Sequence, residues 1–475
     1  MKSKGRSMKK KGLHSGRTLA QQLAQHHSRL TYSKIPASSK LAMKRLLLDY
    51  LGVAIAGSQT DSGRIAREFA GLQGRAPEAK IIGGHERVPM AAASFANAIS
   101  CHSIELDDID VLALFHFSPP VFSSALAVAE AYGADGKELL AALATGCEVM
   151  ERVSMASNND LRNRAFHTTP TCGVFGATVA AGKLMKLNSA KLTSALGLAG
   201  AQASGLMEMY GPSMQKRFNP GPAARNGVTA ALMAKLGFTG TDLIFEGERG
   251  FLYAFAGGKK GSELVHRLSA PYDLHIEFKP YSCARPIHNA IDCALDIRSQ
   301  HHPSITAIQS IVVRRHPDWS EYHRNTMPQT YHEAQVSLPY SVAIALIEGN
   351  ALLGQYTDRK VLDKTVHRLM SNTRIETDAR LPRGVSCHMT IKLKSGETFV
   401  SQIDYPKGSI ENPMSDDELR IKFESLAIPI VGTARASRIV DTVMRIEQCN
   451  NVGDLMRLTT PTFGVSQRQK SRRQH

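Results

Sequence analysis

The sequence predicts a mainly α-helical protein in which a large helical domain, formed by N- and C-terminal segments, accompanies a smaller α+β lid domain. With 475 residues, 43% of them hydrophobic, the chain exceeds what one ordinary core holds, so we expect two domains. Ala and Leu recur at helical spacing over the first half, whereas β-branched runs follow later. These changes in residue pattern divide the chain into a basic tail (1–16), a first helical part (17–270), the α+β domain (271–410), a second helical part (411–462) and a basic tail (463–475).

The first helical part begins with a broad apolar stripe after Ser39 that Gly57 ends. Short Gly, Pro or Asn segments separate the stretches that follow. Wide apolar faces indicate helices packed several deep, as in a bundle. The further predicted helices cover residues 120–134, 137–154, 170–186, 189–207 and 222–236.

The second domain opens with an alternating run at 306–315 that predicts a strand. Residues 385–393 and 397–405 flank Ser395-Gly396 and predict a hairpin. A capping box from Ser415 to Glu418 then starts another helix, and residues 434–447 are amphipathic. We therefore expect the chain to return to the helical domain.

Composition excludes several classes of protein. No run of eighteen or more apolar residues occurs, which argues against a membrane span. The formal charge is +16, but residues 1–17 and 468–475 supply 11 of these charges without an acid, which favours solvated tails over a nucleic-acid partner. The seven cysteines are scattered and form no C-x-x-C, which favours reduced thiols in the cytoplasm and no zinc site.

Two polar clusters are candidates for chemistry. The segment CHSIELDDID at 101–110, with His116 beyond it, is a solvated acidic turn, a metal site or an acid/base cluster lining a cleft. His167 precedes an apolar helix, and a positive helix N-terminus disfavours the imidazolium form, which would keep the ring ready for proton transfer. A structural role for His167 is the competing interpretation.

Two further clusters are rich in cations. Residues 214–225 combine Lys216, Arg217 and Arg225 with helix-starting Pro and Gly, a combination suited to a carboxylate or phosphate. Residues 278–285 include Lys279 at the expected domain boundary, where ligand clefts often lie. A solvated surface loop and a hinge are the alternatives. The chain has no G-x-S-x-G elbow, Walker loop or G-x-G-x-x-G after a strand, which disfavours serine hydrolases and nucleotide enzymes.

In this order, the segments resemble the MmgE/PrpD family, which includes 2-methylcitrate dehydratase, cis-aconitate decarboxylase and iminodisuccinate epimerase. The resemblance covers about residues 17–460. It is carried by segments at 46–57, 94–108, 116–131, 215–240, 277–295 and 333–346, together with the His167 segment.

The resemblance implies a helical domain made from both ends of the chain, a lid between them, and a homodimer with no metal or organic cofactor. It implies an active site in the cleft between the domains that binds a small polycarboxylate. Catalytic roles fall on His116, His167, Glu105 and Lys216, and substrate-binding roles on Asp107, Asp108, Arg217, Lys279 and Tyr340.

Four departures from the family pattern bear on the substrate. Glu105 stands where Asp is usual, Ile109 where Thr is common, Asn219 where many members have a His, and Ala284 where the decarboxylase type has another His. We therefore favour dehydration of a 2-methylcitrate-like hydroxy tricarboxylate over decarboxylation of cis-aconitate. Epimerisation of an iminodisuccinate-like substrate, and ligand binding without catalysis, remain alternatives.

In each family reaction a carbanion forms or is quenched beside a carboxylate. This chemistry requires a base with a suitable pKa and cations that spread the negative charge. His116 and His167 fit the first requirement, and Lys216 and Lys279 fit the second.

Overall fold

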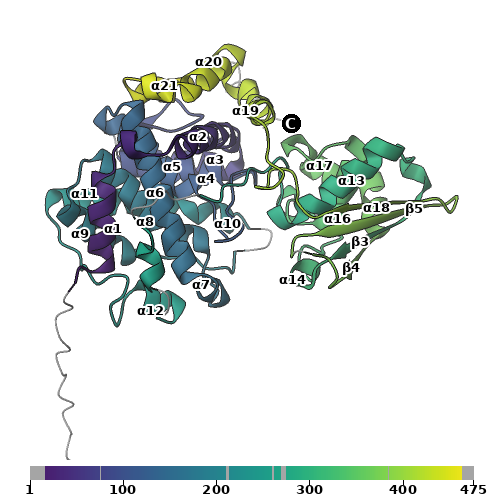
Figure 1. Cartoon of the computed structure of the whole chain (residues 1–475). Helices are drawn as coiled ribbons and strands as arrows, with labels where there is room; N and C mark the ends of the chain where they lie inside the picture. The colour runs from purple at the N-terminus through teal and green to yellow at the C-terminus, as the bar shows by residue number, and fades with distance from the viewer. Residues whose placement is uncertain are drawn as a thin grey trace, which may run out of the picture.

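The computed structural model describes residues 16–74, 76–209, 213–258, 261–268, 274–382 and 384–462. The chain forms a larger helical body and a smaller body built around a sheet (Figure 1). The prediction of a mainly α protein is confirmed. Apart from Gly16, the two predicted basic tails lie outside the described residues.

The larger body is a multilayered helical bundle. Its central helices approach closely because glycines face one another: a Cβ added to Gly176 of α8 would lie 2.6 Å from the carbonyl oxygen of Gly146 of α6. A short antiparallel pair, β1 (Ala79–Lys80) and β2 (Arg87–Val88), borders the bundle. The helices are α1 (Leu19–Arg29), α2 (Ala37–Gly57), α3 (Asp61–Gly71), α4 (Met90–Cys101), α5 (Ser118–Tyr132), α6 (Gly136–Ser157), α7 (Asp160–Asn163), α8 (Thr168–Leu184), α9 (Ser189–Gly200), α10 (Gln215–Phe218), α11 (Pro220–Leu236) and α12 (Phe251–Ala256).

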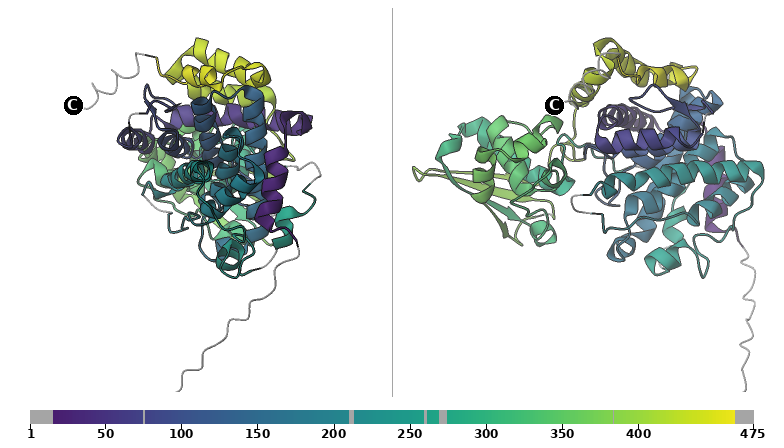
Figure 2. Two further views of the ribbon diagram at one scale, coloured as in Figure 1. Left: turned by 90° about the vertical axis from the view of Figure 1, so that its left-hand side faces the viewer. Right: turned by 180° about the vertical axis from the view of Figure 1, so that it is seen from behind.

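The C-terminal helices return to this body, as Figure 2 shows from two further directions. They are α19 (Asp416–Val431), α20 (Thr433–Met444) and α21 (Val452–Leu458). The predicted capping box of Ser415 is present at the start of α19. Lys422 of α19 forms a 2.6 Å ion pair with the buried Asp49 of α2. The two ends of the chain therefore share one core, which also contains Leu46 and Phe423.

The smaller body contains a four-stranded sheet in the order β4-β3-β5-β6. The strands are β3 (Ile308–Arg315), β4 (Thr373–Thr377), β5 (Cys387–Leu393) and β6 (Thr398–Ile403). The predicted strand and hairpin are confirmed as β3 and as the antiparallel pair β5 and β6. The sequence did not predict β4, which pairs parallel to β3 at the edge of the sheet.

One face of this sheet is covered by helices (Figure 1). Along β5, the side chains of Cys387, Met389, Ile391 and Leu393 are buried, as expected for a sheet with one covered face. The covering helices are α13 (His288–His301), α16 (Leu338–Glu348) and α18 (Lys364–Ser371), and the short helices α14 (Pro317–Ser320), α15 (Tyr331–Ala334) and α17 (Asp358–Val361) complete this body. It has an apolar core of its own. We propose that the two bodies are the two domains predicted above.

No helix among the described residues is long and apolar enough to cross a membrane.

The loop between α4 and α5 is tied to the segment that leads toward the smaller body. Ile109 and Glu277 form an isolated antiparallel bridge, with N···O distances of 3.0 and 2.9 Å. This bridge places the loop where side chains from both bodies meet.

Candidate active site

The acidic segment is a buried loop. Helix α4 ends at Cys101, and Glu105 then adopts a left-handed backbone conformation with φ 55°. Glu105, Asp107 and Asp108 are all buried, so the solvated-turn interpretation is wrong. A buried carboxylate requires a cation or hydrogen-bond donors. The three side chains meet this need in different ways.

Glu105 is surrounded by cations. It forms an ion pair with Lys216, and its carboxylate oxygens lie 3.7 Å from Lys279 Nζ and 3.9 Å from Arg217 Nη2. Lys279 Nζ also donates to the backbone carbonyl of Glu105 at 3.2 Å. Burial acts to raise the pKa of Glu105, but the three cations, Lys216 foremost, hold it well below its usual range. Glu105 is therefore a carboxylate that positions two lysines.

Asp107 accepts a hydrogen bond from His102 and also pairs with His116. The distances from its Oδ2 are 2.7 Å to His102 Nδ1 and 3.1 Å to His116 Nδ1. The backbone carbonyl of Asp108 also lies 2.5 Å from His116 Nδ1. With only acceptors around it, His116 Nδ1 holds the proton, and Nε2 keeps its lone pair. Burial lowers the pKa of His116 to about 3 although Asp107 opposes the shift, so the ring is neutral.

His167 has a partner of the opposite kind. It is the N-cap residue of α8, as its sequence position suggested, and Asn219 Nδ2 lies 3.0 Å from its Nδ1. An amide nitrogen only donates, so His167 Nδ1 accepts and Nε2 holds the proton. Burial, followed by His102, His116 and Lys216, lowers the pKa of His167 well below its ordinary value. The two rings are thus both neutral, with opposite tautomers.

These groups line one cavity of about 160 Å³. Both bodies contribute to its wall. Among the predicted residues, Glu105, His116, His167, Lys216 and Lys279 line it. The remaining lining residues are Ile109, Val111, Leu114, Arg162, Ala284, Arg285, Pro286, Trp319, His323 and Val385.

Four predicted substrate-binding residues are absent from this lining. Asp107 holds His102 and His116, as described above. Asp108 accepts from the backbone N–H groups of Phe117 and Ser118, at 2.7 and 3.0 Å, and so caps the start of α5. Burial, followed by Asp107, raises the pKa of Asp108 to about 7. The structure therefore places Asp107 and Asp108 outside the cavity lining, with Asp107 beside His116.

Arg217 and Tyr340 also lie outside the lining. Arg217 donates to Gln335 Oε1 at 3.0 Å and thereby connects α10 to the smaller body. Tyr340 belongs to the core of the smaller body, and its hydroxyl donates to the carbonyl of Gln355 at 2.6 Å. The substrate-binding role of Tyr340 stays a prediction.

Sequence reasoning missed several residues of the site. Arg285 belongs to the singled-out segment 278–285, but no role was assigned to it; it pairs with Glu277 at 2.7 Å. His102 lies within the acidic motif, and its pairing with Asp107 at five-residue spacing requires the loop conformation. No sequence pattern indicated His323 or Arg162, because only the folded chain brings them to the cavity lining.

The three groups His102, Asp107 and His116 have ligand atoms within 4.8 Å of one another and include residues of the kind that bind metals. The hydrogen bonds of the two histidines already explain why these three side chains lie together.

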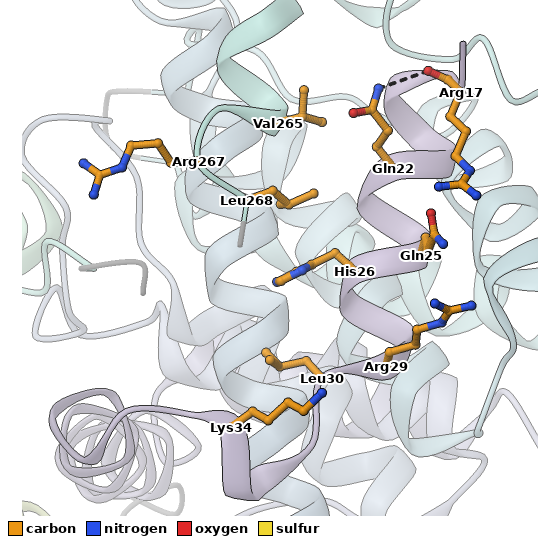
Figure 3. A pocket seen from close by; sticks show the side chains of 10 residues that line it. All are labelled: Arg17, Gln22, Gln25, His26, Arg29, Leu30, Lys34, Val265, Arg267 and Leu268. Carbon is orange, nitrogen blue, oxygen red and sulfur yellow. Dashed lines mark hydrogen bonds between the residues drawn. The ribbon is translucent and has the colours of Figure 1, made fainter. Parts of the chain in front are cut away.

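A second, larger hollow of about 650 Å³ lies beside α1 (Figure 3). Its cations Arg17, Arg29 and Arg267 point in different directions. It contains none of the predicted site residues.

Two family models match this chain. Residues 21–263 match the MmgE/PrpD N-terminal domain and residues 281–448 match the MmgE/PrpD C-terminal domain. The chain therefore belongs to the MmgE/PrpD family, as the sequence segments indicated.

Similar curated proteins span nearly its whole length. The chain is 29% identical over 459 residues to the cis-aconitate decarboxylase-like protein oryM of Aspergillus oryzae, covering 90% of this chain and 94% of that one. It is 27% identical over 440 residues to cis-aconitate decarboxylase of Homo sapiens, covering 89% and 90%. It is 25% identical over 463 residues to cis-aconitate decarboxylase of Aspergillus terreus, covering 91% and 94%.

Proposed function

We propose that this protein is a lyase that acts on a small polycarboxylate through a carbanion formed beside a carboxylate. The observation that carries the proposal is the shared cavity: neutral His116 and His167 line it together with Lys216, Lys279 and Arg285. The cations suit the carboxylates of a substrate, and they stabilise the enediolate into which the carbanion delocalises.

The hydrogen bonds divide the proton transfers between the two histidines. His116 presents an unprotonated Nε2, because Nδ1 is held by Asp107 and the Asp108 carbonyl, and it acts as the base. His167 presents Nε2–H, because Nδ1 accepts from Asn219, and it acts as the acid. A base and an acid on one cavity serve any reaction that removes one group and delivers a proton.

Decarboxylation of an unsaturated tricarboxylate such as cis-aconitate is the first candidate reaction. The relatives described above support it, since they are named as cis-aconitate decarboxylases or a protein like them. In this reaction the bond between carbon and one carboxylate breaks, carbon dioxide leaves, and the electron pair stays on carbon. The lysines stabilise the resulting enediolate, and His167 Nε2 delivers the proton that quenches it and takes up a replacement proton from solvent.

Dehydration of a 2-methylcitrate-like hydroxy tricarboxylate is the second candidate. Ala284 lines the cavity at the position where the decarboxylase type carries a histidine, and this difference favours another reaction. Here His116 Nε2 removes the proton beside a carboxylate and becomes an imidazolium. His167 Nε2–H donates a hydrogen bond to the hydroxyl group, the proton on His116 passes to this hydroxyl, and water leaves as the double bond forms and His116 becomes neutral again. The proposed site needs no further group for either reaction.

An NMR time course in D₂O tests these reactions with cis-aconitate, 2-methylcitrate, citrate and aspartate-derived iminodicarboxylates. Itaconate establishes a decarboxylase, loss of hydroxyl-bearing carbon signals a dehydratase, and inversion with deuterium uptake an epimerase. His116→Ala and His167→Ala should each lower turnover by about 10²–10⁴. Unchanged turnover in both variants, or thermal stabilisation by substrate with no turnover in the native protein, would contradict the proposal.

A further inference from the structure

A second cluster of titratable side chains lies behind the acidic loop and outside the cavity lining. It consists of Asp110 in the loop, Glu151 in α6, and His275 in the segment that leads toward the smaller body. One ligand atom from each residue lies within 4.8 Å of the other two. Three separate parts of the chain thus converge on one point.

Each carboxylate has one oxygen without a hydrogen-bond partner. Asp110 is 0% exposed and Glu151 1% exposed. Asp110 Oδ1 accepts from the backbone N–H groups of Leu112 and Ala113 at 2.7 and 2.8 Å, and Glu151 Oε1 lies 2.8 Å from His275 Nδ1. Asp110 Oδ2 and Glu151 Oε2 are both buried and accept from no donor among the described residues, and the two side chains lie close enough to share a proton.

The charges around this pair do not balance. Across the described ranges, no Lys or Arg nitrogen comes within 4.0 Å of either carboxylate, and His275 is the one titratable base paired with Glu151. Two buried carboxylates side by side must hold a shared proton or a cation, because neither charge is otherwise compensated.

We propose that Asp110, Glu151 and His275 form a binding site for a divalent transition-metal cation, with Zn²⁺ as the fitting representative. Zinc takes imidazole nitrogen and carboxylate oxygen at about 2.0–2.2 Å, which sets ligand atoms of a tetrahedral site about 3.4 Å apart. One ligand atom from each of the three side chains lies within 4.8 Å of the other two, so side-chain rotation must adjust these distances when a cation binds. An imidazole ligand disfavours Mg²⁺ and Ca²⁺, which prefer oxygen.

Entry to the site is available through His275, whose side chain is 39% exposed. The buried carboxylates form the inner wall, and solvent can complete the coordination from the side of His275. The cation would join the loop to α6 and to the segment of Glu277, which already pairs with Ile109. Its role is therefore to fix the loop that carries Glu105 and Asp107, and it does not depend on the reaction proposed above.

Metal binding to the full chain tests this site directly. After treatment with a chelator, the protein is titrated with ZnCl₂, MnCl₂ or MgCl₂, and bound metal is measured by calorimetry and elemental analysis. We expect Zn²⁺ to bind with a stoichiometry near one, Mn²⁺ more weakly, and Mg²⁺ least. Glu151→Gln, Asp110→Asn and His275→Ala should each weaken Zn²⁺ binding at least tenfold.

Two controls make the result specific. Glu138→Gln changes a partly exposed carboxylate on the same helix, keeps its capping capacity and should leave binding unchanged. His116→Ala removes one histidine of the His102, Asp107 and His116 cluster, and it should also leave this binding unchanged. Binding that persists in Glu151→Gln and His275→Ala, or that disappears in His116→Ala, overturns the proposal. His275→Ala changes a partly exposed side chain, so the test stands even where a buried variant does not fold.

Discussion

At the scale of single residues, the partner of each histidine decides its chemical role. His116 and His167 are both buried and neutral, yet acceptors surround Nδ1 of the first and a donor meets Nδ1 of the second. Side chains outside the cavity lining therefore select which ring presents a lone pair and which presents an N–H group. Asn219 is such a positioning residue, and it stands where many family members have a histidine.

Asn219→Asp should reverse the tautomer of His167. A carboxylate only accepts, so the proton moves to Nδ1, and the added charge raises the pKa of the ring. We expect kcat to fall by about 10²–10³ and the acidic limb of the pH profile to move to higher pH. Asn219→Ala removes the donor without adding a charge and should lower kcat without that displacement. Identical pH profiles for the two variants would argue that Asn219 has a purely structural role.

At the scale of elements, the position of the acidic loop depends on close contact between α2 and α4. Gly57 ends α2 against the last turn of α4, and a Cβ added there would lie 1.8 Å from the carbonyl oxygen of Ser100. Backbone cannot yield as a side chain does, so any larger residue must push the helices apart. His102 and Glu105 follow directly after this contact.

Gly57→Ala should therefore destabilise the protein by about 1–3 kcal/mol and disturb the loop. Gly71→Ala is the matched control, because this glycine lies in α3 with no atom within 4 Å of its added Cβ. It should be neutral or stabilising by about 0.5–1 kcal/mol, since Ala favours a helix more than Gly does. Chemical denaturation measures the free energy of unfolding of both variants. Equal values for the two variants would show that α2 and α4 separate without loss of stability.

Elements with a continuous apolar pattern could be predicted, and those shaped by distant contacts could not. The stretches at 120–134 and 222–236 became α5 and α11 nearly as expected. The stretch at 189–207 ends as α9 at Gly200, because the following chain turns back and the carbonyl of Gly205 accepts from His167 N at 2.9 Å. Strand β4 was missed because its sequence, TRIET, is mostly polar and lies at a sheet edge.

At the scale of the whole molecule, the site is assembled from parts that are far apart in the sequence. Glu105 meets Lys216 and Lys279, which are 111 and 174 residues further along. The sequence reveals these residue types but not their pairing, so the acidic segment could be interpreted as a solvated turn. The family resemblance supplied their grouping for five residues of the cavity, whereas Tyr340, which it also named, lies outside the cavity lining.

The whole molecule should also lose stability in acid, because it buries several neutral histidines. Burial, the largest cause in each case, lowers the pKa of His27, His167 and His288 well below the ordinary value, and that of His323 and His332 to about 4. In the unfolded chain these rings take up protons near pH 6.5. The unfolded state then binds more protons than the native state, so stability is fully present above pH 6.5 and falls as the pH falls toward the native pKa values.

His27→Leu isolates one part of this effect. His27 lies in α1 with 0% exposure, and neither ring nitrogen has a hydrogen-bond partner among the described residues. Leucine fills similar space without a group to desolvate, so the variant should match or exceed the native stability at pH 7.5. At pH 5 it should be more stable by up to about 2 kcal/mol, because each pH unit below 6.5 costs the native protein about 1.4 kcal/mol for this ring. His301→Leu, at an exposed ring, is the control and should keep the native pH dependence. Parallel stability profiles for His27→Leu and the native protein between pH 5 and 7.5 would mean that His27 accepts its proton without unfolding, and that the acid sensitivity of the molecule has another origin.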